Sequence, residues 1–123
     1  MVSVTDVTAF LRAAFPGWTF VANEFATNNP DDCAYVRMQS GFAPSEWTTK
    51  RRPGFQIVLR AKNPQDAEAR SNAIFAALHG KTEFKLGNTR VIKCTSDQSA
   101  PIYLDKDANG RTLYSLNFNI TIL

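Results

Sequence analysis

Hydrophobic residues recur with a helical period at the start of the chain. They fall at i, i+3, i+4 and i+7 on one helical face, at Val7, Phe10, Leu11 and Ala14. Ser3 can cap this helix, with Asp6 three residues on as its capping-box partner. Pro16-Gly17 is expected to end it. The pattern therefore predicts an amphipathic first helix with one buried face.

A second helix is marked at both of its ends. Asn63 is the expected N-cap, and Pro64 takes the first helical position, where its missing N–H costs nothing. Gly80 supplies the residue that ends the helix. The single histidine, His79, lies in the last turn, where a cation or an N–H donor suits the helix dipole. The apolar stripe of this helix consists of Ala67, Ile74, Phe75 and Leu78.

Period-two alternation predicts the strands. They are expected at residues 18–25, 33–38, 55–62, 89–95, 101–104 and 113–123. The order is helix, three strands, helix, three strands, which indicates a single α+β domain over residues 1–123. We expect a mainly antiparallel twisted sheet with both amphipathic helices packed on one face. The expected core consists of Phe10, Leu11, Ile57, Leu59, Ile74, Phe75, Leu78, Phe118 and Ile120.

The stretch YLDKDANGRTLY contains the D-x-D-x-N-G opening of an EF-hand calcium loop, beginning at Asp105. The twelfth position of that loop needs a bidentate Glu, but the residue there is Leu116. Strand-like runs flank the stretch where an EF-hand has helices. Asn109-Gly110 tolerates positive φ, so the sequence predicts a β-hairpin turn and no metal site.

Composition is that of an ordinary globular domain, and it limits the function classes. Of the 123 residues 44% are hydrophobic, and the net charge is +3, which permits contact with nucleic acid but does not require it. No run of 18 apolar residues predicts a membrane span, and the N-terminus lacks the features of a signal peptide. Cys33 and Cys94 have no metal or redox spacing and are expected to be reduced thiols in or near the core.

No catalytic constellation is evident in the sequence. The chain has one histidine and no G-x-S-x-G, P-loop or H-E-x-x-H motif. The carboxylate pairs Asp31-Asp32 and Asp105/Asp107 lie in predicted turns, where aspartate bonds nearby backbone N–H groups. We therefore expect no enzyme activity, no cofactor and no metal, although a site assembled only in three dimensions stays an alternative.

Residues 40–54 have no clear period and are predicted to form a long loop between the second and third strands. A basic run with nearby aromatic residues lies in this segment: Phe42, Trp47, Lys50, Arg51 and Arg52. Such a loop is either simply solvated or contacts phosphate or an acidic protein surface. It is the first candidate interface.

The final strand is the second candidate interface. One face of it carries uncharged polar residues, including Asn117, Asn119 and Thr121, and no Lys, Glu or Pro follows Arg111. Exposed edge strands are usually guarded by such residues. This strand is therefore either central in the sheet or an edge that a neighbouring subunit covers, and its uncharged amides suit a subunit contact.

Four blocks resemble a known family: FPG, SGFAP, RRPGFQIVLRAKNPQDAEARSNAIFAALHG and QSAPIYLDKDANGRTLYSLNFNI. In order and spacing they are similar to the small bacteriophage minor capsid and tail terminator proteins, from about Phe15 to Ile120. The resemblance includes a small-Pro-aliphatic strand, a D-x-x-G-R turn and an alternating strand.

The resemblance implies a structural virion protein without catalytic residues. Such proteins form a ring, typically hexameric, that caps the tail tube, stops tube polymerisation and meets the head or neck connector. Double-stranded DNA passes through the lumen without sequence-specific binding. The implied location is the tail at the head–tail junction, after assembly in the host cytoplasm. A nucleic-acid-binding module or another head–tail connector protein stays an alternative.

Overall fold

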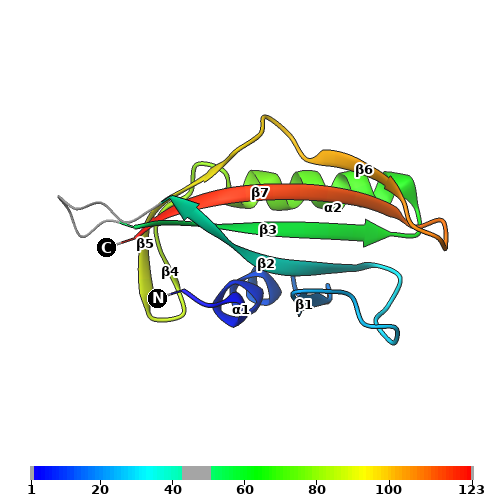
Figure 1. Ribbon diagram of the computed structural model, residues 1–123, viewed down its shortest axis with the longest axis horizontal. Coiled ribbons are helices and arrows are strands. Elements are labelled where there is room, and N and C mark those ends of the chain that lie inside the picture. The colour runs from blue at the N-terminus through cyan, green and yellow to red at the C-terminus, as the bar shows by residue number, and fades with distance from the viewer. Residues whose placement is uncertain (1, 43–50, 123) are drawn as a thin grey trace.

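The computed structural model describes residues 2–42 and 51–122 of the chain. The elements in chain order are α1 (Val4–Ala14), β1 (Phe20–Ala22), β2 (Cys33–Phe42), β3 (Arg52–Ala61), α2 (Pro64–Leu78), β4 (Thr82–Leu86), β5 (Thr89–Ser96), β6 (Ile102–Lys106) and β7 (Thr112–Ile122) (Figure 1). The α+β class is confirmed.

Both helices begin where their capping residues predict. The Ser3 hydroxyl accepts from the backbone N–H of Asp6, whose carboxylate accepts from the backbone N–H of Ser3, which completes the capping box. The Asn63 side chain accepts from the backbone N–H of Gln65, and Pro64 occupies the first turn of α2. Local side-chain chemistry therefore determines where the two helices start.

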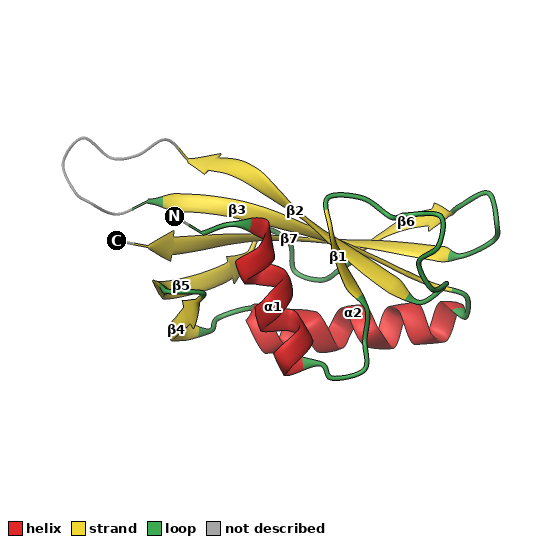
Figure 2. Ribbon diagram, turned by 90° about the horizontal axis from the view of Figure 1, so that it is seen from below, coloured by secondary structure: helices red, strands yellow, loops and turns green. Residues whose placement is uncertain are grey.

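The strands form one mixed, curled sheet (Figure 2). Their order is β1-β2-β3-β7-β5-β4, with β6 paired to β7 beside this path. β1 runs parallel to β2, whereas the other paired strands are antiparallel. α1 contacts β1, β2 and β4, and α2 contacts β3, β5 and β7. The expected mainly antiparallel sheet with both helices on one face is not confirmed in that form.

Three boundaries differ from the sequence-based expectation. The predicted first strand shortens to β1, because Asn23 takes a positive φ of 71° and Glu24 N–H turns back to the carbonyl of Ala22. The predicted loop at residues 40–54 is shorter, because β2 continues to Phe42 and β3 starts at Arg52. β4 was not predicted, since it is only five residues long and mostly exposed, although Phe84 and Leu86 do alternate with Glu83 and Lys85.

One hydrophobic cluster joins the helices to the sheet. The expected core residues Leu11, Ile57, Leu59, Ile74, Leu78, Phe118 and Ile120 are all buried in it, while Phe10 and Phe75 are half-buried against it. Phe55, Ile57, Leu59 and Ala61 of β3 enter the cluster as the alternation predicted. Cys33 and Cys94 are buried and free, as expected.

The molecule is elongated, and its two ends are made of different segments (Figure 1). The β1–β2 loop, the β3–α2 junction and the β6–β7 turn lie at one end, which we call the β6 end. The β4–β5 hairpin, the start of β3 and the end of β7 lie at the other, which we call the β4–β5 end. The backbone of Arg51 exchanges two hydrogen bonds with Ile122 there.

Candidate assembly surfaces

The first candidate interface lies at the β4–β5 end and is only partly described. Trp47 and Lys50 lie outside the described residues, as does the side chain of Phe42, whose backbone pairs with Arg52. Arg51 and Arg52 are exposed. Their guanidinium groups are thus placed where they can meet an acidic surface or phosphate, and this role stays a prediction.

The strand that carries the second candidate interface is central in the sheet. β7 pairs with β3 on one side, and with β6 and β5 on the other. The alternative that β7 is an edge covered by a neighbouring subunit is therefore wrong. Its backbone needs no partner chain, because both sides of the strand already pair. The side chains of Asn117, Asn119 and Thr121 remain half-buried, and their role in a subunit contact stays a prediction.

These polar side chains form a hydrogen-bonded row across three strands. Gln39 Nε2 of β2 donates to Asn117 Oδ1 over 3.3 Å, and Asn117 Nδ2 donates to Ser115 Oγ over 3.3 Å. Gln56 Nε2 of β3 donates to the same Ser115 Oγ over 2.9 Å. Asn119 Nδ2 donates to the carboxylate of Asp97. The row is uncharged except at Asp97, so it can meet a partner without burying many ions.

Gly54 of β3 leaves space within this row. It pairs with Gln39 of β2 and with Asn119 of β7. A Cβ at position 54 would lie 3.0 Å from Asn119 Oδ1 and 3.2 Å from the carbonyl oxygen of Phe118. The absent side chain therefore lets the Asn119 amide lie flat against the sheet.

The β6–β7 turn is the predicted hairpin. Asp107 N–H donates to the carbonyl of Arg111, and the Asp107 carboxylate accepts from the backbone N–H groups of Asn109 and Arg111 and from the Arg111 guanidinium. Desolvation alone would raise the pKa of Asp107, but these hydrogen bonds and the guanidinium charge outweigh it and lower the pKa. The EF-hand-like spacing thus serves the turn.

An exposed apolar strand was missed as a candidate surface. Ile102, Tyr103 and Leu104 of β6 are 40%, 53% and 45% exposed. The sequence does hold a signal, because these three large apolar residues are consecutive, whereas a strand with one buried face alternates.

His79 makes a hydrogen bond beyond the role expected of it. It follows α2 as predicted, but its Nδ1 accepts a hydrogen bond of 3.0 Å from the backbone N–H of Ser96, and its ring stacks on Phe75. At Nδ1 the imidazole is therefore an acceptor that joins the helix end to β5, a contact that the sequence did not predict.

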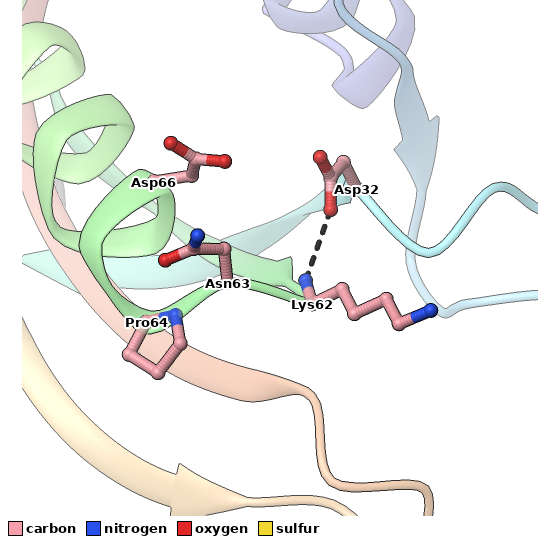
Figure 3. Close-up of a pocket in the computed structure, with 5 residues that line it drawn as sticks. All are labelled: Asp32, Lys62, Asn63, Pro64 and Asp66. Carbon is pink, nitrogen blue, oxygen red and sulfur yellow. Dashed lines mark hydrogen bonds between the residues drawn. The ribbon is translucent and has the colours of Figure 1, made fainter.

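The described residues gather no evident catalytic set. A hollow of about 550 Å³ at the start of α2 is lined by Asp32, Lys62, Asn63, Pro64 and Asp66 (Figure 3). Asp32 accepts from the backbone N–H of Lys62, and Asn63 caps the helix, so these groups support the local backbone. Within residues 2–42 and 51–122, no group of three His, Cys, Asp or Glu is arranged to hold a metal.

The two thiols are poorly suited to chemistry. Burial raises the pKa of Cys94 to about 12. Burial also raises the pKa of Cys33, against the opposing charge of Arg60. Since the thiolate is the reactive form, both side chains act as small apolar groups. No helix in the described part of the chain is long and apolar enough to cross a membrane.

Comparison with known proteins gives one family and one fold. A family model described as bacteriophage tail terminator protein matches residues 22–123. No curated protein matches the chain. Seven chains of solved structures match, and one of them is 12% identical, covers 94% of this chain and 88% of its own length, and has a TM-score of 0.56. That structural likeness concerns the fold alone.

Proposed function

The chain belongs to the bacteriophage tail terminator family, a family of structural phage tail proteins, and on that premise we propose that it forms a ring that caps the tail tube. The ring, typically a hexamer, stops polymerisation of the tube protein and offers its other face to the head or neck connector. Double-stranded DNA passes through its lumen without being read in sequence. The protein assembles in the host cytoplasm and resides at the head–tail junction of the virion.

The observation that carries this proposal is the extent of the family match. Residues 22–123 include β2 to β7 and the whole of α2, so nearly the complete sheet lies within the matched segment. The match therefore concerns the domain that would build a ring, and not an isolated motif.

The proposed activity has a simple physical basis. A tube of stacked rings grows because the top of each ring accepts the bottom of the next, a heterologous contact that does not close. A terminator binds the top ring with one face and presents a face that refuses the tube protein. This work needs shape and surface chemistry, and no catalytic residue.

Two surfaces of the described chain suit such contacts. The uncharged row that contains Asn117 and Asn119 can be covered by a protein partner at a low desolvation cost. The exposed cations Arg51 and Arg52 can contact an acidic protein surface or the phosphates of passing DNA. We propose the first surface for a subunit contact and the second for a protein interface or the lumen.

Interruption of the gene in its phage tests the proposal. We expect tails that exceed the normal length and vary widely, with heads that remain unattached, because nothing then stops the tube. Electron microscopy of the lysate measures both features. Tails of normal, uniform length in the interrupted phage would contradict the proposal, and restored length after expression of the protein from a plasmid is the control.

A further inference from the structure

β6 contains the large hydrophobic residues that the described part of the chain leaves exposed. The three large hydrophobic residues that are exposed among residues 2–39 and 51–122 are Ile102, Tyr103 and Leu104, which are consecutive in this strand. Single exposed apolar residues are common, but a continuous exposed group indicates a contact surface.

This strand is also an edge whose central residues are unprotected. Within the described ranges β6 pairs only with β7, so its other side lacks a strand neighbour. Natural proteins protect such edges with charges or by covering their backbone groups. Pro101 precedes the strand, and a β-bulge with the charged residues Asp105 and Lys106 protects its end, but residues 102–104 between them carry no charge.

The two outer strands of the main path are protected by comparison. In β1, Arg12 donates to the carbonyl of Phe20, and the N–H of Glu24 donates to the carbonyl of Ala22. β4 carries Glu83 and Lys85, both exposed. The contrast marks β6 as the edge that is left open.

Both faces of β6 take part in this surface. Ile102 pairs with Ser115, whose hydroxyl accepts from Gln56 in the polar row, so Ile102 lies on the side of that row. The Tyr103 ring lies 5.7 Å from Tyr114, which packs against the core, so Tyr103 lies on the helix side. A partner that covers both sides of an open edge is an extended strand, which adds main-chain hydrogen bonds.

The β6 end is acidic. Its segments, residues 23–32, 60–66 and 105–111, carry six carboxylates and four cations (Figure 1). Arg111 pairs with Asp107 and Asp31, and buried Arg60 bonds the carbonyls of Pro30 and Asp31. Arg70 of α2 lies 4.0 Å from Asp32 and adds a fifth cation, so carboxylates exceed cations by one. The carboxylates are Glu24, Asp31, Asp32, Asp66, Asp105 and Asp107, and the cations are Arg60, Lys62, Lys106 and Arg111.

The β4–β5 end is basic. Residues 51–53 and 81–93 carry six cations: Arg51, Arg52, Lys81, Lys85, Arg90 and Lys93. The carboxylates there are Glu83, which pairs with Arg90, and Asp6, whose position beside Gly87 brings it to the same end. The described chain is thus bipolar, with opposite charge at its two ends.

We propose that β6 is the edge strand that a neighbouring copy of this chain covers, with the acidic β6 end of one copy against the basic β4–β5 end of the next. The occupant is a second copy because the chain itself carries the complementary charge at its other end. A contact between two different surfaces of identical copies is heterologous, and it produces a ring when the rotation between copies closes. This inference rests on the proposed ring and names two surfaces that join its subunits in addition to the polar row.

Native mass spectrometry of the full chain over a range of concentrations tests the contact. The variant Leu104→Lys places a guard on the open edge, and Leu104 is 45% exposed, so the monomer should keep its fold, which circular dichroism checks. We expect the concentration needed for ring assembly to rise at least about tenfold, the equivalent of about 1.4 kcal/mol. The control Ala13→Lys adds the same charge at an exposed site of α1, which contacts β1, β2 and β4, and it should assemble like the wild type.

A second variant tests the partner surface. Leu104→Lys combined with Lys85→Glu restores opposite charges between neighbouring copies, and it should recover part of the lost assembly. Rings that form equally well with Leu104→Lys overturn the inference and leave the proposed function standing. Two other results would also overturn the inference. If the wild type forms only a dimer that Leu104→Lys dissociates, β6 mediates a dimer and not a ring. If the variant forms intact rings that no longer bind the tube, the tube protein and not a second copy covers β6. If the double variant assembles no better than Leu104→Lys, the β4–β5 hairpin is not the surface that β6 contacts. If the wild type never forms rings, both the inference and the proposed ring are wrong.

Discussion

The Asp107 carboxylate shows how a motif-like spacing can serve local structure. It accepts hydrogen bonds from two backbone N–H groups and from the Arg111 guanidinium, and such bonds stabilise a tight turn. Asp105 likewise accepts from the N–H of Lys106. The sequence allowed this prediction because Leu116 stands where a calcium loop needs Glu.

Acid should weaken the protein partly through Asp107. The pKa of Asp107 lies below its ordinary value of 3.8, so the group stabilises the fold above that pH and loses this effect as the pH falls through the lowered pKa. Asp107→Asn removes the titration and should flatten the fall in the free energy of unfolding below about pH 4. Urea unfolding of both proteins at several pH values measures this, and equal slopes in the acid range would contradict the assignment.

Asn119 provides a direct test of the polar row as a subunit contact. Asn119→Lys should leave the monomer folded, because residue 119 lies on the face of β7 opposite to the core and Asp97 can pair with the new ammonium group. Ring assembly should fail, since the contact would then bury an ammonium–carboxylate pair, whose desolvation is costly, where the wild type has a neutral amide. The control Asn119→Ser keeps the site small and polar. Normal rings from the Lys variant would remove this row from the interface.

At the scale of elements, the sequence predicted what local chemistry decides. The caps Ser3 and Asn63 determined both helix starts, and Asn109-Gly110 marked the hairpin. β4 was missed because only two of its five residues, Phe84 and Leu86, are apolar. The parallel pairing of β1 was missed because the turn-like residues between β1 and β2 favoured a hairpin. The contact of His79 with Ser96 was missed because the two residues are 17 positions apart.

The two neighbours Ile74 and Phe75 on α2 test the register of the helix on the sheet. Ile74 is fully buried, so Ile74→Ala should cost about 2–5 kcal/mol of unfolding free energy. Phe75 is half-buried beside Phe118 and His79, so Phe75→Ala should cost less than the about 3–5 kcal/mol of a fully buried phenylalanine. The shift in the denaturant midpoint of each variant measures its loss of unfolding free energy, provided that the dependence of that free energy on denaturant concentration is unchanged. An unchanged midpoint for Ile74→Ala would show that α2 faces the sheet with another side.

At the scale of the whole molecule, sheet order is what the sequence could not supply. β7 is the last strand in the chain, yet it lies between β3 and the pair β5 and β6, so the apparent edge at the C-terminus is interior. The open edge is β6 instead, at the acidic end of a bipolar domain. The candidate residues of the sequence therefore fall on two different surfaces: Arg51 and Arg52 at the basic end, and Asn117 and Asn119 within the polar row.

A tail protein that assembles through complementary ends should also lose assembly as salt screens those charges.

The central claim is that this chain stops growth of the tail tube, and the length of tubes assembled from purified tube protein tests it most directly. Negative-stain electron microscopy gives the length distribution with and without the chain, added at a small fraction of the tube subunits. We predict shorter tubes that do not extend when fresh tube protein is supplied, with extra density at one tip only. Tubes that reach the same lengths and keep growing in the presence of the chain would contradict the account.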